Sequence, residues 1–421
     1  MKSMRVCGIS HADSLSARFN GLSIKSKLSE EGIEYSLLSD LHERVSGKSI
    51  TPERLRRLSA SIAEFEAKTG FQSRFYFWTV WILFNKHFRK AHVVHYHILH
   101  NNFFRLEALK LLTRIKPSVW TLHDLWITTG HCIQPLDCNR YGHGCGQCPA
   151  LGRTIAVQRD RTEHEYARKV RLIKKLNCDY IVSTQWMRTR VLANLPIDSD
   201  RLHLIPFGID SLLFTPFSVK ESHLIREKYQ ISDNAFTVFM NAHNDVIKGI
   251  EIVKKIVSSE VDLKNVLFIL IDAGGLFASN QNVISLPRAT TGEEMREYFG
   301  ISNLVIVPSL GESFSLITLE AMSCGKPVVT LKESAAHEVT DSEEFFTFSE
   351  ANVVEKISQI IRISSSEQYL LEEEGSRNRA RVLENFELDK HSKSVSALYQ
   401  SLIEKRKGRL RPFLSAISRT R

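Results

Sequence analysis

The chain has no hydrophobic run long enough to cross a bilayer. Its most apolar window, FYFWTVWILF at residues 75–84, has charged residues on both sides and is about half as long as a membrane span requires. The first residues, MKSMRVCGIS, enter a short apolar segment without a hydrophobic signal region or a small-residue cleavage site. We therefore expect a cytoplasmic protein in which residues 75–84 form a buried or interfacial helix.

Internal repeats, low-complexity blocks and a glycine-rich dinucleotide fingerprint are also absent. No G-x-G-x-x-G opens either half of the chain, which disfavours a dinucleotide-dependent dehydrogenase. Cysteine is sparse outside one stretch, GHCIQPLDCNRYGHGCGQCP at residues 130–149. Thiols stay reduced in the cytoplasm and disulfides are rare there, so this cluster needs another explanation.

What the chain does contain is an alternation of short apolar runs with amphipathic helical stretches. The expected strands are MRVCGIS, HVVHYHIL, SVWTLHD and CDYIVST in the first half, and TVFMNA, LFILIDAG, LVIVPS and PVVTL in the second. Helical patterns such as LSIKSKLSEEG and IEIVKKIVSS lie between them. The alternation predicts an α/β protein with two doubly wound, Rossmann-like parallel sheets.

The length of 421 residues suggests two domains of roughly 200 residues each. The periodicity is interrupted by prolines and a glycine in LIPFGIDSLLFTPFS, residues 204–218, which is typical of a hinge. We predict an N-terminal domain over residues 1–212, a second domain over 213–390, and a C-terminal helix with a basic tail over 391–421. Ligands are expected in a cleft where the carboxyl ends of the two sheets face each other.

The net charge of +9 favours anionic partners. Basic residues concentrate between Arg153 and Lys175 and in the tail KRKGRLRPFLSAISRTR, which contains no acid. Basic and apolar residues alternate in this tail, which suits contact with an anionic membrane surface. The alternative is a solvated helix face followed by a frayed terminus.

The strongest chemical signal is LVIVPSLGESFSLITLEAMSCGKPVVT, residues 304–330. A buried strand, a tight loop and a helix follow one another here, with Ser313 or Ser315 expected to cap the helix. Such a helix start offers free N–H groups to a phosphate. Glu312 lies in the loop, whereas Glu320 lies among apolar neighbours and needs partners such as the vicinal hydroxyls of a ribose. The alternative is a capping role for Glu312 and an ion pair for Glu320.

Glu312 and Glu320 form an E-x7-E element, and the segment around them closely resembles that of retaining GT-B glycosyltransferases of family 4. IPFGID, NDVIKG and VWTLHDLW extend the resemblance over residues 93–340 or so. The resemblance implies a GT-B fold and transfer of a sugar from a UDP- or GDP-sugar without a metal or other cofactor. No D-x-D motif stands in a convincing position.

The resemblance also implies roles for individual residues. Lys248 matches the lysine that pairs with the donor diphosphate, and Glu312 the glutamate beside the transferred sugar. Glu320 matches the ribose-binding glutamate, and the backbone of Ser313, Phe314, Ser315 and Leu316 would hold phosphate. One departure concerns the arginine that usually precedes the lysine, because MNAHNDVIKG contains none.

His123 follows the strand VWTL and matches a histidine that lies beside the donor sugar, so we predict that it is catalytic. Asp124 would orient His123 or cap the next turn. In HVVHYHILHNN, His95 and His97 share one face of a strand and His100 lies beyond its end. Acceptor binding by these histidines is preferred to a metal site.

Cys132, Cys138, Cys145 and Cys148 have the spacing C-x5-C-x6-C-x2-C, which is compatible with a closed four-thiolate zinc site. A subgroup of bacterial polysaccharide-assembly enzymes in the family, including the colanic-acid-type transferases, has a similar segment. We hypothesise a structural zinc clasp on the acceptor side. Reduced thiols without a metal are the first alternative, followed by disulfides or an iron–sulfur site.

The sequence thus predicts a retaining hexosyltransferase of surface polysaccharide biosynthesis, such as exopolysaccharide or lipopolysaccharide. Its acceptor would be a glycan, expected to be lipid-linked, reached from the inner face of the cytoplasmic membrane. Two alternatives remain: a GT-B sugar-nucleotide epimerase or hydrolase, and a zinc-containing nucleic-acid-binding protein. The second is disfavoured because no basic recognition helix follows the cysteines, so no nucleic acid is expected as a partner.

Overall fold

The computed structural model describes residues 3–11, 22–40, 50–153, 155–259, 266–271 and 273–418, and only the backbone of 409–418. The chain divides into two compact units. Unit 1 comprises residues 1–206 and 391–421, and unit 2 comprises residues 207–390. The break after Pro206 falls inside the predicted hinge but before the expected boundary at residue 212. The expected separate segment 391–421 belongs to unit 1, because helix α14 (Leu388–Ser418) packs on it.

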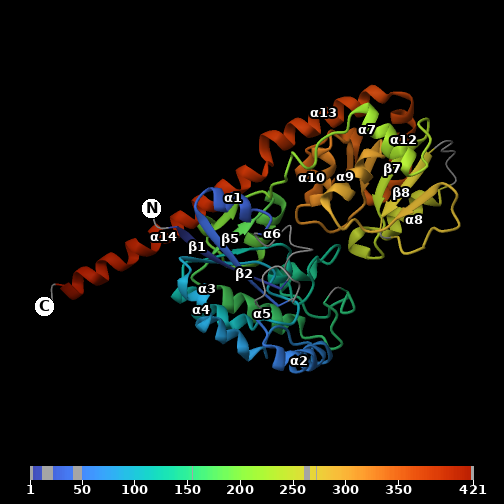
Figure 1. Ribbon diagram of the computed structural model, residues 1–421. Helices are drawn as coiled ribbons and strands as arrows, with labels where there is room; N and C mark the ends of the chain where they lie inside the picture. Colours follow the sequence, from blue (N-terminus) through green and yellow to red (C-terminus); the bar gives the residue numbers. More distant parts are fainter. Residues whose placement is uncertain are drawn as a thin grey trace. The chain divides into compact units, whose positions relative to one another are not determined.

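Unit 1 contains a parallel sheet of six strands in the order β2-β1-β3-β4-β5-β6 (Figure 1). The strands are β1 (Met4–Ser10), β2 (Ile33–Ser39), β3 (Val93–Tyr96), β4 (Ser118–Thr121), β5 (Asp179–Val182) and β6 (Leu202–Leu204). The helices are α1 (Lys25–Glu30), α2 (Arg56–Thr69), α3 (Lys86–Lys90), α4 (Leu109–Ile115), α5 (Thr162–Ile173), α6 (Gln185–Asn194) and most of α14. Short 3-10 helices are η2 (Glu53–Leu55), η3 (Phe77–Phe84), η4 (Leu106–Ala108), η5 (Trp126–Thr128), η6 (Arg140–His143) and η7 (Ser199–Arg201).

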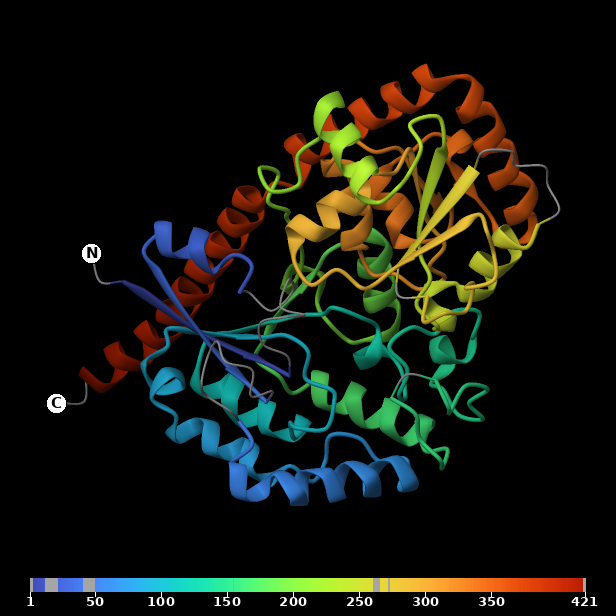
Figure 2. The same cartoon turned by 45° about the vertical axis from the view of Figure 1, so that its right-hand side comes forward.

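Unit 2 contains a second parallel sheet of six strands in the order β12-β11-β10-β7-β8-β9, with helices on both faces (Figure 2). The strands are β7 (Phe236–Asn241), β8 (Val266–Ile271), β9 (Val283–Leu286), β10 (Leu304–Val307), β11 (Val328–Leu331) and β12 (Thr347–Phe348). The helices are α7 (Val219–Lys228), α8 (Ile250–Val257), α9 (Gly292–Gly300), α10 (Leu316–Ser323), α11 (Ala335–Thr340), α12 (Val353–Ser366) and α13 (Gln368–Asn385), with 3-10 turns η8 (Val246–Lys248), η9 (Glu344–Phe346) and η10 (Glu350–Asn352).

Each sheet has its own hydrophobic core. Strands β3, β4, β10 and β11 are buried at every residue, because parallel strands are covered by helices on both faces. Their apolar residues are what made them visible in the sequence. All eight expected strands are present, whereas β2, β6, β9 and β12 were not anticipated. Strand β9 is only four residues long and half-buried.

Residues 75–84, expected to form a buried or an interfacial helix, are neither fully buried nor fully exposed. Residues 77–84 form the 3-10 helix η3, which buries Trp78 and Ile82 but leaves Phe84 76% exposed. The alternative interpretation of residues 153–175 as a solvated helix face is partly wrong. On α5, Arg168 and Lys169 are buried and hydrogen-bonded, because they satisfy buried carboxylate and carbonyl oxygens.

Candidate functional site

The first candidate site lies in unit 2, where Lys248 and Glu312 meet. Lys248 follows β7 and Glu312 follows β10, and these two strands are neighbours in the sheet. The chain leaves β7 toward β8 on one side, while β10 lies on the other. This position is the topological switch point of a doubly wound sheet, where ligands bind at the carboxyl ends of the strands.

Backbone contacts hold the two loops together. The N–H groups of Leu310 and Gly311 both donate to the carbonyl of Ile247, at 2.9 and 3.2 Å. Gly249 has a φ of 75°, and a Cβ at this position would collide with the carbonyl oxygen of Pro308. A glycine is therefore required next to Lys248 for the loops to approach each other.

Lys248 Nζ donates to Glu312 Oε1 at 2.8 Å. The Glu312 charge raises the pKa of Lys248, although burial acts in the opposite direction. Arg288, in the turn after β9, lies near enough to oppose this rise. Arg288 is exposed. This arginine was not identified from the sequence, because only the residues that precede Lys248 were considered. The short apolar run of β9, two residues before Arg288, was the signal that could have identified it.

The segment from Ser313 to Leu316 leads into α10, but the expected serine cap is wrong. Ser315 is the N-cap residue with a φ of 76°, and its side chain makes no capping hydrogen bond. Its hydroxyl instead lies 2.8 Å from Thr318 Oγ1. The Ser315 side chain thus does not cap the first N–H groups of α10. A phosphate is a suitable acceptor for N–H groups at a helix start.

Two further predicted donor-binding residues of unit 2 are buried. The Phe314 ring packs against Phe207 and Phe386, with ring centroids 5.2 and 5.9 Å apart. Only the backbone of Phe314 is therefore suited to hold phosphate. Glu320 is 1% exposed on α10, where its carboxylate requires polar partners.

The second candidate site lies in unit 1 around His123, two residues after the end of β4. His123 Nε2 lies 3.1 Å from His97 Nδ1, and His97 Nε2 lies 3.1 Å from Tyr35 Oη. Burial lowers the pKa of His123 to about 4, so its ring is neutral near pH 7. The His97 contact was not anticipated, because strand spacing does not show which loop lies beside His123.

The other histidines of unit 1 have distinct partners. His95 hydrogen-bonds Tyr399 Oη on α14 at 2.6 Å and Thr121 Oγ1 at 2.7 Å, inside the unit. His100 Nε2 lies 2.7 Å from Asp124 Oδ2, while Asp124 Oδ1 accepts the N–H of Trp126. Asp124 therefore caps the next turn and pairs with His100.

The four clustered cysteines of unit 1 are reduced in the structure. Gly130 N–H donates to Cys145 Sγ at 3.2 Å and Ala150 N–H to Cys148 Sγ at 3.4 Å. Among the described residues, no three histidine, cysteine, aspartate or glutamate side chains are placed to hold a metal ion. The structural zinc at these cysteines stays a prediction.

A buried lysine fixes the segment that leads into this cysteine loop. Lys169 Nζ donates to the carbonyls of Trp126 and Thr129 at 2.8 and 3.1 Å and lies 3.7 Å from the centre of the Trp126 ring. Burial lowers the pKa of Lys169 to about 7. The sequence gave no sign that this lysine, among several basic neighbours, is the buried one.

Comparison with known proteins identifies the chemistry that these sites suit. Residues 237–366 match the family model described as "Glycosyl transferases group 1". The chain is 26% identical over 287 residues to the Escherichia coli K12 protein WcaC, named as a colanic acid biosynthesis glycosyl transferase, covering 65% of this chain and 67% of that one. It is 25% identical to a D-inositol 3-phosphate glycosyltransferase of Pseudarthrobacter chlorophenolicus over 36% of this chain and 39% of that protein.

Solved structures show the fold. The structure of Anabaena Alr3699/HepE with UDP-glucose covers 94% of this chain and 100% of its own, at a TM-score of 0.64 and 16% identity. WaaG, a glycosyltransferase involved in lipopolysaccharide biosynthesis, covers 94% of this chain and 99% of its own, at a TM-score of 0.64 and 14% identity. The predicted GT-B fold is confirmed, and the family match and relatives support a glycosyltransferase.

Proposed function

Because the chain carries a group 1 glycosyltransferase domain on a GT-B fold, we propose that it transfers a hexose from a UDP- or GDP-sugar to a glycan acceptor with retention at the anomeric carbon. The observation that carries this proposal is the Lys248–Glu312 pair beside the start of α10. A compact cation and the N–H groups of a helix start together suit a diphosphate. The UDP-glucose complex of a structural neighbour supports the donor class.

In the proposed reaction, the bond between the anomeric carbon and the diphosphate oxygen breaks, and a bond to the acceptor oxygen forms on the same face. The acceptor proton passes to the departing diphosphate. Lys248, assisted by Arg288, offsets the charge that grows on this leaving group. Glu312 positions the sugar and Glu320 binds the ribose hydroxyls, as the resemblance implies. His123 of unit 1, with a ring that is neutral near pH 7, is proposed as a further catalytic residue. No step requires a metal.

A thermal-shift panel with UDP, GDP and their sugars tests this proposal, since a ligand that binds only the native state raises the melting temperature. One nucleotide family should stabilise the wild type, and Lys248→Ala should lose that response. Lys255→Ala, which changes an exposed lysine on α8, should retain it. If no nucleotide stabilises a folded wild-type protein, the donor site is wrong. Donor consumption without any acceptor would favour an epimerase or hydrolase.

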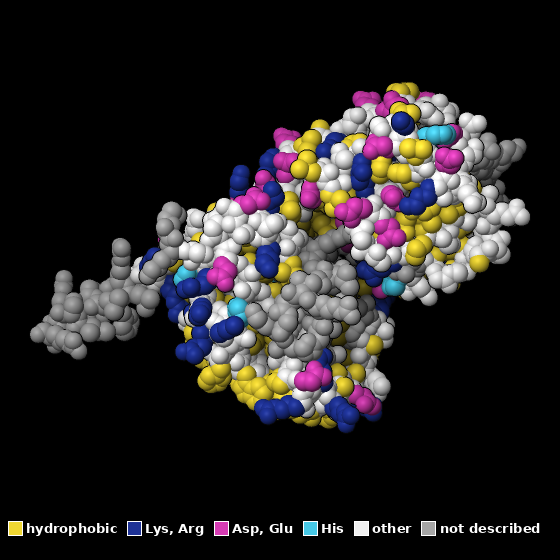
Figure 3. All heavy atoms as spheres, in the orientation of Figure 1, with side chains coloured by type: hydrophobic (Ala, Val, Ile, Leu, Met, Phe, Trp, Pro, Cys, Tyr) yellow, Lys and Arg dark blue, Asp and Glu magenta, His cyan; other side chains and the backbone are white. Residues whose placement is uncertain are grey.

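We further propose a lipid-linked acceptor and peripheral contact with an anionic membrane at the cytoplasmic face. Within the described part of the chain, no helix is long and apolar enough to cross a membrane. Unit 1 instead exposes aromatic side chains of Phe75, Phe77, Trp81 and Phe84. Figure 3 shows hydrophobic side chains gathered along the lower edge of unit 1 and flanked by lysine and arginine. Exposed apolar patches of this kind mark interaction sites.

A basic band continues from this aromatic patch. From Ala67 to Leu106 the sequence contains no aspartate or glutamate. Helix α3, which begins two residues after η3, carries Lys86, Arg89 and Lys90. Lys116 Nζ donates to the carbonyl of Arg89 at 2.8 Å. Burial lowers the pKa of Lys116, and the positive charge of Arg406 lowers it further. The band thus suits anionic headgroups, while the aromatic rings suit the membrane interface.

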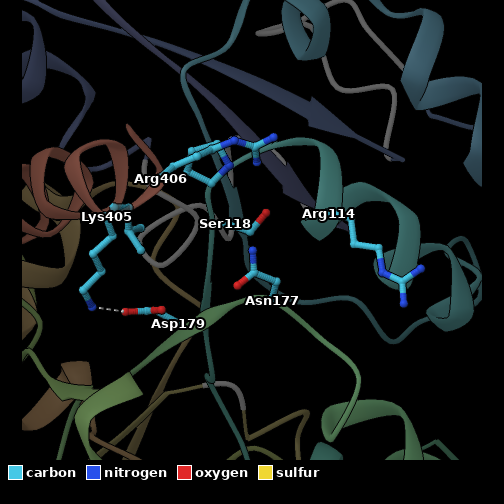
Figure 4. Close-up of a pocket in the computed structure, with 8 residues that line it drawn as sticks. Arg114, Ser118, Asn177, Asp179, Lys405 and Arg406 are labelled. Atoms are coloured by element: carbon cyan, nitrogen blue, oxygen red, sulfur yellow. Dashed lines mark hydrogen bonds and ion pairs between the residues drawn. The ribbon is translucent and has the colours of Figure 1, made fainter. Parts of the chain in front are cut away.

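The band ends at a pocket of about 220 Å³ at the amino ends of β4 and β5 (Figure 4). Arg114 and Arg406 line it, together with Lys405, which turns to Asp179 and pairs with it at 3.2 Å. Exposed Leu111 and Ile115 lie on α4 beside Arg114. The sequence suggested the basic tail as the membrane contact, but the side chains of residues 409–421 lie outside the described residues. The proposal therefore rests on the aromatic patch and the basic band.

Cosedimentation with vesicles tests the membrane contact. The wild type should bind vesicles of phosphatidylglycerol and phosphatidylcholine more than vesicles of phosphatidylcholine alone. Trp81→Ser combined with Phe84→Ser should weaken binding at least several-fold. The matched control is Leu224→Ser on α7, which replaces a similarly exposed apolar side chain in unit 2. Equal binding by all variants would overturn this part of the proposal.

A further inference from the structure

A cavity of about 150 Å³ lies in unit 1 between the C-terminal part of α2 and residues 100–102, which follow β3. Its lining combines apolar surface from Phe71, Trp126 and Val157 with polar side chains from α2 and the segments after α2 and β3. An apolar cavity of similar volume holds a molecule as large as benzene. The cavity is therefore large enough for one small ring.

Three amide side chains line this cavity, those of Gln72, Asn101 and Asn102. Gln72 is 5% exposed, and its Oε1 accepts from Trp126 Nε1 at 3.0 Å. Its Nε2 has no hydrogen-bond partner among the described residues. A buried N–H group without a partner costs about 1–3 kcal/mol, and a hydroxyl of a bound molecule would satisfy it.

The ionisable groups of the lining are already engaged. Glu66 accepts the N–H groups of Ser73 and Arg74, both at 2.8 Å. His100 is held between Asp124 and Asn101 at 2.7 and 2.8 Å. No lysine or arginine occurs among the described residues that line the cavity. The lining therefore suits a neutral ligand and offers nothing to neutralise a phosphate.

The position of the cavity connects it with the proposed reaction. His100 lines the cavity and hydrogen-bonds Asp124, which directly follows His123. Trp126, two residues further on, contributes its ring to the same lining. Asn101 and Asn102 both adopt positive φ values, 76° and 66°, and such strained backbone is often found at binding sites.

We propose that this cavity is a subsite for one neutral sugar ring of the acceptor, with Gln72 and Asn102 hydrogen-bonding its hydroxyls and Trp126 and Phe71 contacting its apolar face. The proposal rests on the proposed glycosyl transfer, because only that function calls for an acceptor sugar in unit 1. Aromatic rings beside amides provide the combination of apolar contact and hydrogen bonds that such a ring needs.

The test uses methyl glycosides of glucose, galactose, mannose and N-acetylglucosamine as probes in saturation-transfer NMR with the full chain. At least one should receive saturation from the wild type. Ala63→Leu fills the cavity from α2 and should abolish the signal, whereas Ala60→Leu, an exposed position outside the lining on the same helix, should retain it. Asn102→Gly removes an amide without backbone strain, because glycine accepts a φ of 66°, and should reduce the signal several-fold.

The nucleotide thermal shift is measured in parallel, because the donor residues lie in unit 2. If the nucleotide shift is normal but no glycoside receives saturation, the subsite is wrong and the proposed function stands. Equal signals from Ala60→Leu and Ala63→Leu, both folded, would also overturn the subsite. If the nucleotide shift itself is missing, the proposed function fails independently of the cavity.

Discussion

Lys248 Nζ lies 2.8 Å from Glu312 Oε1, although the two residues are 64 positions apart in the sequence. The pair joins the ends of two neighbouring strands, β7 and β10. In this state the lysine is held by a carboxylate, and a nucleotide diphosphate would compete for the same cation. Mutation of each partner therefore tests a different step: Lys248 tests donor binding, and Glu312 tests the chemical step.

Glu312→Gln should lower kcat by roughly 100-fold or more, because it removes the carboxylate proposed to position the sugar. The variant should keep the nucleotide thermal shift or enlarge it, since Lys248 is no longer held by a negative charge. Steady-state kinetics and the thermal shift measure the two effects separately. Loss of nucleotide binding together with activity would assign Glu312 to donor binding instead.

His97→Phe should lower activity at least 10-fold, because His123 loses the partner that fixes its tautomer. Burial lowers the pKa of His123 to about 4, so the ring is neutral at pH 7 and its ¹⁵N shifts report the tautomer directly. Those shifts should change in His97→Phe, while nucleotide binding should not. Unchanged His123 shifts would reduce His97 to a packing role. Tyr35→Phe, one contact further away, should have a smaller effect.

The His100–Asp124 pair should make stability depend on pH. Burial alone would lower the pKa of His100, but Asp124 outweighs it and the pKa rises, despite the opposing charge of Lys169. Burial likewise opposes the lowered pKa of Asp124, which His100 holds down. The stabilisation from His100 is complete below its unfolded pKa of about 6.5 and disappears as pH rises through the raised folded value. That from Asp124 is complete above about 3.9 and disappears as pH falls through its lowered value.

Asp124→Asn should therefore destabilise the protein most between about pH 4 and 6.5, and less at pH 8.5. The asparagine oxygen can still accept the N–H of Trp126, but its NH2 group then faces His100, so the change removes the charge together with the acceptor for His100. Urea unfolding at pH 5.5 and 8.5 measures the difference. An equal loss of stability at both pH values would show that the pair contributes through geometry rather than charge.

Lys169→Met should lower the free energy of unfolding by roughly 2–4 kcal/mol, because buried carbonyl groups lose their donor. The affected carbonyls include those of Trp126 and Thr129. Lys174→Met replaces an exposed lysine just beyond the same helix and should change stability by less than about 0.5 kcal/mol. Similar effects from both variants would contradict a special role for the buried lysine.

The cysteine spacing predicts one zinc per chain, which elemental analysis of the purified protein measures. Cys145→Ser should lose the metal, whereas Cys178→Ala, buried outside the cluster, should retain it. If no metal is found and all seven cysteines react as reduced thiols after unfolding, the zinc prediction is wrong. Nucleotide binding should be unaffected by chelators in either case.

The sequence by itself determined the fold class and the donor-site motif. Buried parallel strands are rich in apolar residues, so β3, β4, β10 and β11 were recognisable without knowledge of their neighbours. The run from β10 through Glu312 into α10 is local, and its order along the chain is sufficient to identify it. Strands β9 and β12, of four and two residues, were too short to be recognised.

Only the tertiary structure decided which side chains meet. The hydrogen bonds of His123 with His97 and of His100 with Asp124 depend on β3 lying beside β4, and strand order is not written in local periodicity. Burial of Lys169 and exposure of Phe84 likewise depend on what packs against each position. Hydrophobic pattern specifies an element and its buried face, because burial of apolar surface drives folding. Hydrogen bonds between distant residues are specific only once the elements are packed, since water satisfies the same groups in the unfolded chain.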